Sequence, residues 1–401
     1  MQAKLTKNAG RIESIDILRG IVMVIMALDH VRDYMHIDAN VADPLNVATT
    51  TPILYFTRWI THFCAPIFVF LSGVSIYLQS LRKTKKELSI FLIKRGLWLI
   101  LAECFIISLG WTFNPYYNII PLQVIWAIGI SMVLLGLMIH LPFKLILVTG
   151  LLIVFGHNLL DFYEAAPGFK PGFWWDLLHS GRFTPHAFGK QYYILIVYPF
   201  LAWTGLMMLG YCTGTFFAPG YSAERRKKVL TYIGVSLLLI FVVFRYFNLF
   251  GNPRDWEVQK NSWLSFLSFL NVHKYPPSLL YLCVTIGIAL LILPWLEGFR
   301  NGFTRRISIF GRTAFFYYIL HIFLVHIMAT IAFFVRGEHT VEQAILSMQN
   351  LPFLFVIPGE GYSLAVVYLL WLLLVAILYP ICKWYDRYKT NHKEKKWLSY
   401  L

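Results

Sequence analysis

Apolar stretches of about 20 residues recur along the whole chain of 401 residues, and this repetition limits the possible folds most strongly. A helix of about that length crosses a hydrocarbon core roughly 30 Å thick. Hydrophobic residues make up 58% of the chain and charged residues only 14%, a composition that excludes an ordinary soluble domain. The sequence therefore predicts an all-α integral membrane protein with a single transmembrane domain over residues 1–401.

The hydropathy pattern predicts about ten transmembrane helices, at residues 14–36, 62–80, 88–110, 120–139, 143–161, 191–216, 229–249, 277–297, 307–335 and 361–384. Lys and Arg favour the cytoplasmic side of a membrane. With ten spans and both termini in the cytoplasm, the basic clusters all fall on that side: residues 4–11, 82–86, 224–228, 300–306 and 393–396. The charge pattern therefore supports the predicted topology.

The net charge of +15 is explained by this topology signal and by attraction to anionic lipid head groups, so it requires no nucleic acid. The first residues are polar and basic, and no cleavable signal peptide is expected. The five cysteines lie singly, without the spacing of a metal site. We expect them to pack as small apolar residues, and we predict no metal.

Four long segments are expected on the outer face: residues 37–61, 162–190, 250–276 and 336–360. Trp174 and Trp175 in the second segment suit recognition of carbohydrate or lipid head groups, but an interfacial aromatic belt is an equal alternative. In the third segment, "NSWLSFLSFLNV" predicts a short helix at the membrane interface.

The first apolar stretch, "SIDILRGIVMVIMALDHVRDYMH", carries charged groups that are costly in hydrocarbon. Arg19 and His30 are eleven residues apart, which places them on nearly the same helix face and about 16 Å apart along the axis. Asp16 is three residues from Arg19 and can pair with it. Asp33 is three residues beyond His30 and can orient its ring, whereas Asp29 points to another face. The alternative is a snorkelling Arg19 and an interfacial His30.

The ninth span repeats this order in "FGRTAFFYYILHIFLVHI". Arg312 lies near the cytoplasmic face, His321 near the middle and His326 further out. The two histidines are five residues apart, a poor fit to metal ligation on one helix. His321 is either an ordinary hydrogen-bonded core residue or part of a site shared with His30.

Lys94 and Arg95 stand near the cytoplasmic entrance of the third span. With Arg19 and Arg312 they can form a basic mouth that binds phosphates, because Arg makes bidentate contacts and Lys supplies a point charge. Snorkelling to lipid phosphates is the alternative.

Two prolines mark the outer ends of spans. Pro66 lies inside the second span, shortly after His62, and is expected to kink or open that helix. Pro276 precedes the eighth span in "KYPPSL" and places Lys274 and Tyr275 at the outer mouth of the helix bundle. The alternative for these two residues is a lipid-facing anchor.

Several motifs together resemble those of bacterial membrane proteins related to heparan-α-glucosaminide N-acetyltransferase. They are "RIESIDILRGIVMVIMALDH", "TRWITHFCAPIFVFLSG", "LQVIWAIGISMVLLG", "YPFLAWTGLMMLGYCTG", "KYPPSLLYL" and "FGRTAFFYYILH". The spacing of Arg19 and His30 also resembles the first-helix signature of the membrane O-acyltransferases called acyltransferase family three.

The resemblance implies a transmembrane acyltransferase that moves an acyl group, most simply acetyl, from cytoplasmic acyl-CoA to a sugar or glycoconjugate on the outer side. The implied residues for acetyl-CoA are Arg19, Lys94, Arg95, Arg312 and His321. His30 would act as general base or accept the acyl group itself, supported by Asp33. Donors for the oxyanion would come from His62, Lys274, Tyr275 and His321.

The catalytic histidine has a second candidate, His36. In the eukaryotic lysosomal relative this histidine lies in the loop after the first helix, and Asn matches the position of His30. The acceptor is expected to contact Asp29, Lys274, Tyr275, Trp174 and Trp175. The resemblance also implies a multi-pass protein of the bacterial inner membrane, with a homodimer as its oligomeric state.

Two functions of other classes remain open at this stage. A polytopic transporter or lipid flippase would use the intramembrane Arg and His residues as a substrate or proton path, with inverted repeats and broken helices. A binding partner in envelope biogenesis would need no chemistry and would tolerate His30→Ala. Dependence on CoA distinguishes the enzyme from both.

Overall fold

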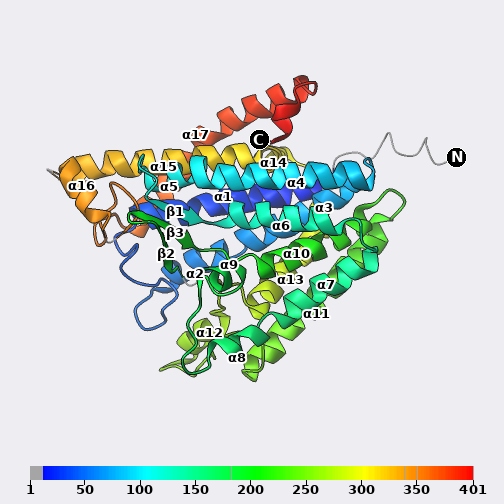
Figure 1. Ribbon diagram of the computed structural model, residues 1–401, viewed down its shortest axis with the longest axis horizontal. Coiled ribbons are helices and arrows are strands. Elements are labelled where there is room, and N and C mark those ends of the chain that lie inside the picture. The colour runs from blue at the N-terminus through cyan, green and yellow to red at the C-terminus, as the bar shows by residue number, and fades with distance from the viewer. Residues whose placement is uncertain (1–11, 182, 338, 350, 401) are drawn as a thin grey trace.

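The computed structural model describes residues 12–400 apart from 182, 338 and 350, so the predicted basic cluster at 4–11 lies outside the described residues. The fold is a bundle of helices with a small sheet and short helices at one end (Figure 1). The main helices are α1 (Glu13–Met35), α3 (Cys64–Ser80), α4 (Lys85–Ala102), α6 (Val124–Met138), α7 (Phe143–Gly156), α10 (Leu201–Thr213), α11 (Ala223–Tyr246), α13 (Leu279–Leu296), α14 (Gly302–Arg312), α15 (Ala314–Arg336) and α17 (Leu364–Asn391).

The shorter helices are α2 (Pro52–Thr61), α5 (Ser108–Thr112), α8 (Leu159–Glu164), α9 (Phe173–Leu178), α12 (Ser262–Leu270) and α16 (Val341–Ser347). A π-helical turn, Glu103–Ile107, joins α4 to α5, and 3-10 turns follow at Gly214–Phe217 and Lys396–Tyr400. The helix α12 confirms the helix predicted from "NSWLSFLSFLNV".

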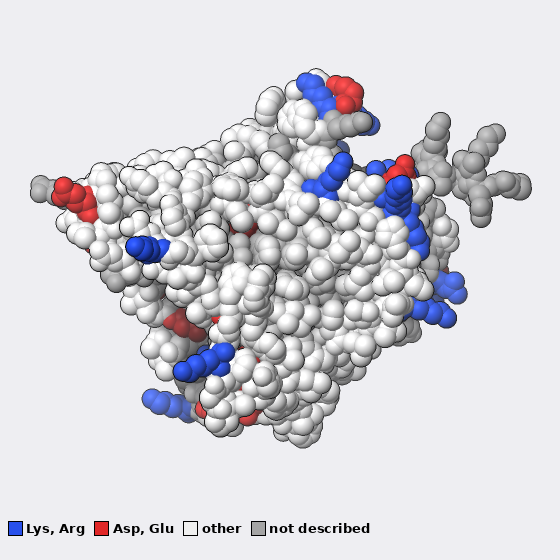
Figure 2. Space-filling model, viewed as in Figure 1, with Lys and Arg blue, Asp and Glu red and all other residues white. Residues whose placement is uncertain are grey.

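Among the described residues, five helical segments are long and apolar enough to cross a membrane: Pro52–Ser80, α11, α13, α15 and α17. The apolar helices α6 and α7 are shorter. The visible face carries Lys and Arg mainly at its two ends, and the surface between them is almost free of charged residues (Figure 2). This uncharged belt and the long apolar helices are those of a membrane protein.

Three sequence predictions about secondary structure were wrong in detail. Residues 37–61 were expected to be a loop but contain α2, which continues into α3 after a short interruption. The span predicted at 191–216 begins as a strand, and its helix α10 starts only at Leu201. An all-α fold was expected, yet β1 (Ile119–Leu122), β2 (Pro185–Phe188) and β3 (Tyr192–Ile196) form a sheet ordered β1-β3-β2.

In this sheet β1 runs parallel to β3, with Ile120 opposite Ile194, and β2 runs antiparallel to β3. Strand β1 packs against the π-helical turn and α6, and Figure 1 shows the sheet near one end of α1. Its strands are short, and hydropathy alone did not separate the apolar run of β3 from the helix that follows.

The first helix, α1, lies at the centre of the bundle and packs against α2, α3, α13, α14, α15 and α17. Its contact with α14 depends on two glycines. A Cβ atom on Gly20 would lie 2.1 Å from the carbonyl oxygen of Ile307, and one on Gly311 would lie 1.9 Å from that of Asp16. Small residues allow this close backbone approach, which brings the polar groups of α1 near those of α14 and α15.

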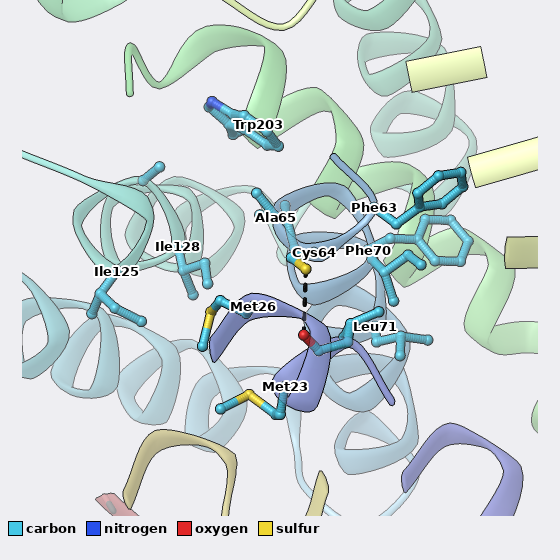
Figure 3. Packing of buried hydrophobic residues seen from close by; sticks show 14 of the residues in the cluster. Met23, Met26, Phe63, Cys64, Ala65, Phe70, Leu71, Ile125, Ile128 and Trp203 are labelled. Carbon is cyan, nitrogen blue, oxygen red and sulfur yellow. Dashed lines mark hydrogen bonds between the residues drawn. The ribbon is translucent and has the colours of Figure 1, made fainter. Parts of the chain in front are cut away.

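Buried apolar side chains of α1, α3 and α6 face one another in the interior of the bundle. Met23 and Met26 of α1 belong to the same buried cluster as Cys64 of α3 and the isoleucines Ile125 and Ile128 of α6 (Figure 3). The thiol of Cys64 donates to the carbonyl oxygen of Val22 at 3.3 Å. The cysteines Cys64, Cys212, Cys283 and Cys382 are free and buried, as expected of apolar packing residues, and Cys104 is partly buried.

Candidate active site

Arg19 and His30 mark the two ends of a polar path along α1. The guanidinium of Arg19 pairs with Asp16 at 3.4 Å, which confirms that predicted ion pair. It also donates to the hydroxyl of Ser75 at 2.9 Å and to the carbonyl oxygen of Gly311 at 3.2 Å. These contacts link α1 to α3 and α14 at the depth of Arg19.

His30 faces His321 of α15, and not the expected Asp33. Nδ1 of His30 lies 2.7 Å from Nε2 of His321. Nδ1 of His321 lies 3.1 Å from the carbonyl oxygen of Tyr317 in the same helix. The indole ring of Trp111 packs edge-on against the imidazole of His30, with 4.8 Å between centroids. The sequence analysis left open a site shared by these two histidines, and the structure brings their ring nitrogens within hydrogen-bond distance.

The carboxylates of α1 belong to an ion network beside His30. Asp29 accepts from Arg32 at 3.1 Å and is hydrogen-bonded to Arg58 of α2. Arg32 also donates to Asp33. Asp33 is therefore oriented by Arg32, and the hydrogen-bond partner of His30 is His321 instead. The sequence analysis did not predict Arg58 as a site residue. Its position one helical turn before the predicted His62 was a signal that could have indicated it.

The interruption between α2 and α3 is a consequence of Pro66. Proline lacks an amide hydrogen and its ring clashes with the carbonyl four residues earlier, which here belongs to His62. That carbonyl accepts the hydroxyl of Tyr281 from α13 at 2.7 Å instead. The expected opening of the helix at Pro66 is confirmed. The Nδ1 atom of His62 is buried and has no hydrogen-bond partner among the described residues.

Lys274 and Tyr275 lie just before α13, whose first turn is capped by Ser278. The side chain of Lys274 is 8% exposed, and no described carboxylate lies within ion-pair distance of its ammonium. Its Nζ atom lies 5.0 Å from the ring centroid of Tyr275. Burial by itself raises the pKa of the Tyr275 phenol, but the charges of Lys274 and Arg58 outweigh it and lower that pKa below its ordinary value.

Three cavities follow one another along this path. The first, which we call the arginine cavity, has a volume of about 330 Å³ and lies beside Arg19, Ser75, Arg95, Arg312 and Lys389. The second, the His30 cavity, measures about 40 Å³ and is lined by Asp29, His30, Cys64, Gln123, Tyr198 and Lys274, among others. The two share Met26, Phe68, Val124 and Tyr318 as wall residues.

The third, the loop-side cavity, has a volume of about 1220 Å³ and is lined by Arg58, His62, Asp161, Glu164, Arg245 and Tyr275, among others. Lys274 lines both this cavity and the His30 cavity. The structure therefore places Lys274 at the boundary between a large polar space and the small space beside His30.

The cations predicted to form a basic mouth are only partly brought together. Arg19, Arg95 and Arg312 line the arginine cavity, and Lys389 joins them from α17. Arg312 makes a bidentate ion pair with Asp386, with contacts of 2.9 and 2.7 Å. Lys94 is exposed and does not line this cavity, because on a helix its neighbour Arg95 points to a different side.

The other predicted residues lie outside the three cavities. His36 is 7% exposed, and its Nδ1 atom accepts the backbone amide of Asp38 at 3.2 Å. Trp174 is 77% exposed, and the indole of Trp175 donates to Glu164 at 2.8 Å. None of these three residues lines a cavity described here.

The fold and this path define a helical membrane protein with polar groups arranged across its apolar core. The family model for heparan-alpha-glucosaminide N-acetyltransferase, catalytic, matches residues 11–246, more than half of the chain. The chain belongs to this family, as the motifs indicated. No curated protein matches it. Membership implies an acetyltransferase. The match covers His30, Arg58 and His62, whereas Lys274, Arg312 and His321 lie beyond it.

Proposed function

We propose that this protein transfers an acetyl group from cytoplasmic acetyl-CoA to an amine or hydroxyl of a glycan or glycoconjugate on the outer side of a bacterial inner membrane. The observation that carries the proposal is the row of three cavities, with His30 in the smallest of them. A substrate on each side can approach the same histidine without crossing the bundle.

The arginine cavity is the proposed entrance for acetyl-CoA. Guanidinium groups bind phosphates through charge-assisted hydrogen bonds, and Arg19 and Arg95 line this cavity. The shared wall residues Met26, Phe68 and Val124 are apolar and suit the pantetheine arm. Arg19 and His30 are about 16 Å apart along α1, a distance that an extended arm covers.

At the His30 cavity, His30 acts as general base on the acceptor. The acceptor nitrogen or oxygen attacks the thioester carbonyl carbon and gives its proton to His30. The resulting oxyanion lies near the buried ammonium of Lys274, which stabilises the developing charge. The carbon–sulfur bond then breaks, and the CoA thiolate takes the proton from His30.

The loop-side cavity is the proposed acceptor site. Its volume of about 1220 Å³ accommodates several sugar units, and its wall carries both cations and carboxylates, including Arg58 and Glu164. His62, with an unsatisfied ring nitrogen, is a further group that can contact the acceptor. This assignment places the acceptor contacts on Lys274, Tyr275 and His62, with Trp174 and Trp175 farther out.

A transporter is the second candidate, because broken helices are typical of transporter sites and the described chain has breaks between α2 and α3 and at Thr313 between α14 and α15. The size of the His30 cavity favours the enzyme. A space of about 40 Å³ admits a few waters or a small acyl group but not a whole substrate.

Ligand-induced stabilisation of the purified protein in detergent tests the proposal. Acetyl-CoA, CoA and desulfo-CoA, each at a hundred times the dissociation constant, should raise the unfolding free energy by about 2.7 kcal/mol. Release of CoA thiol from acetyl-CoA should then depend on an added acceptor, with D-glucosamine as the probe. Absence of stabilisation by all three compounds at millimolar concentration would overturn the proposal and leave the transporter as the leading function.

A further inference from the structure

We propose that His321 is a positioning residue that fixes the ring tautomer of His30, so that the nitrogen available to the substrate is the basic one. This inference rests on the proposed role of His30. It follows from two hydrogen bonds, one from His321 to its own helix and one between the two imidazoles.

The first hydrogen bond determines the tautomer of His321. Its Nδ1 atom lies 3.1 Å from the carbonyl oxygen of Tyr317. A carbonyl oxygen can only accept, so Nδ1 of His321 carries the hydrogen. A neutral imidazole has one N–H group, and the other nitrogen, Nε2, is then an acceptor.

The second hydrogen bond transmits this choice to His30. Nε2 of His321, an acceptor, lies 2.7 Å from Nδ1 of His30, so Nδ1 of His30 must donate. The lone pair of His30 is therefore on Nε2. No described residue makes a hydrogen bond to Nε2, and the ring lines the His30 cavity, with Trp111 packed against it. The basic nitrogen is thus the accessible one.

The same pair supports the charged state of His30. When Nε2 takes the proton of the acceptor, the imidazolium keeps donating from Nδ1 to neutral His321, and the proton leaves again from Nε2 to the thiolate. A carboxylate often has this supporting role. Here the carboxylates next to His30 in the sequence of α1, Asp29 and Asp33, are held by Arg32 and Arg58. A neutral acceptor avoids a further buried negative charge.

Substitutions at His321 distinguish a role as hydrogen-bond acceptor for His30 from a role in packing alone. In His321→Gln the side-chain oxygen can still accept from Nδ1 of His30, whereas His321→Leu offers no acceptor. With acetyl-CoA and D-glucosamine, we expect His321→Leu to lower kcat about 100-fold, the lower range for loss of general-base function. We expect the KM for acetyl-CoA to stay within about threefold, and His321→Gln to retain kcat within about tenfold of the parent.

His326→Leu is the matched control, because it removes another buried imidazole from the same helix. Its ring nitrogens contact the carbonyl oxygens of Gly110 and Leu354 and not the ring of His30. We expect a stability loss similar to that of His321→Leu but a kcat within about threefold of the parent. Equal kcat values for His321→Leu and His321→Gln, or equal losses in His321→Leu and His326→Leu, would overturn the inference.

Nitrogen-15 NMR of labelled histidines tests the tautomer without any turnover, and the His30→Asn variant assigns the signal. The Nδ1–H form of His30 is expected in the parent and in His321→Gln, and a substantial Nε2–H population in His321→Leu. An Nε2–H form in the parent would overturn the inference even if transfer is intact. Conversely, the expected tautomers without any acetyl transfer would overturn the proposed function alone.

Discussion

Among the described residues, two pairs of histidines lie ring to ring, and the two pairs differ in whether a ring lines a cavity. In the bundle, Nδ1 of His30 lies 2.7 Å from Nε2 of His321. Beside the sheet, Nδ1 of His157 lies 3.3 Å from Nε2 of His179. The second pair is backed by a carboxylate, since Glu164 lies 2.7 Å from Nδ1 of His179, whereas the first pair is backed by a backbone carbonyl.

The two pairs differ in access to the nitrogen that is not used within the pair. His157 and His179 are both buried, and Nε2 of His157 is enclosed without a partner among the described residues. His30 instead lines a cavity that adjoins the arginine cavity and meets the loop-side cavity at Lys274. A general base must reach the proton that it removes. The His157–His179 pair has a supporting carboxylate, as many catalytic histidines do. The His30–His321 pair lacks one, but His30 lines a cavity.

The largest expected effect is the difference in acetyl transfer between a variant of the His30–His321 pair and a variant of the His157–His179 pair. We expect His30→Ala to lower acetyl transfer about 1000-fold, within the range for loss of a general base, and His157→Ala to stay within about threefold of the parent. The measurement is CoA thiol release with acetyl-CoA and D-glucosamine. A similar loss in both variants would abolish the distinction, since it would indicate a shared structural role.

A substitution of Lys274 tests whether the boundary between the His30 cavity and the loop-side cavity is a reaction site. Lys274→Met removes the buried cation at the boundary of the His30 cavity, and we expect kcat to fall about 100-fold, as on loss of an oxyanion donor. Lys260→Met is the control, because this lysine is exposed in the same segment before α13 and lines none of the three cavities. If only KM for the acceptor rose in Lys274→Met, the lysine would bind the acceptor and not stabilise the oxyanion.

Substitutions of two neighbouring cations on α4 test whether the arginine cavity binds acetyl-CoA. Arg95→Gln removes a cavity-lining guanidinium, and we expect the KM for acetyl-CoA to rise about tenfold, or roughly 1.4 kcal/mol in binding. Lys94→Gln changes an exposed residue outside the cavity and should leave KM within about twofold of the parent. The reverse order of effects would place the CoA phosphates on the helix surface instead.

The smallest effect concerns the scaffold beside the His30 pair. Tyr281→Phe leaves the carbonyl of His62 without its donor at the helix interruption. We expect a loss of about 1 kcal/mol in unfolding free energy and little change in kcat, measured by unfolding in detergent and by thiol release. A large loss of kcat with unchanged stability would show that the interruption positions His62 for chemistry.

Much of the fold could be predicted from the sequence, because the length of an apolar stretch and the charges within it can be read from one continuous segment. The membrane character, the central helices and the Asp16–Arg19 pair follow from spacings within one segment. Pro66 similarly predicted an opening, since its effect reaches only the carbonyl four residues back. The sheet at Ile119–Leu122 and Tyr192–Ile196 was missed, because its pairing joins segments far apart in the chain.

The sequence by itself determined which apolar segments carry polar groups, namely Arg19 and His30 in the first predicted span and Arg312 and His321 in the ninth. The tertiary structure decided their partners. The close contact of α1 with α14 at Gly20 and Gly311 brings these helices together, and His321 rather than Asp33 meets His30. Contacts between helices depend on rotation and crossing angle, which hydropathy and spacing do not encode, so the site emerges only when the bundle packs.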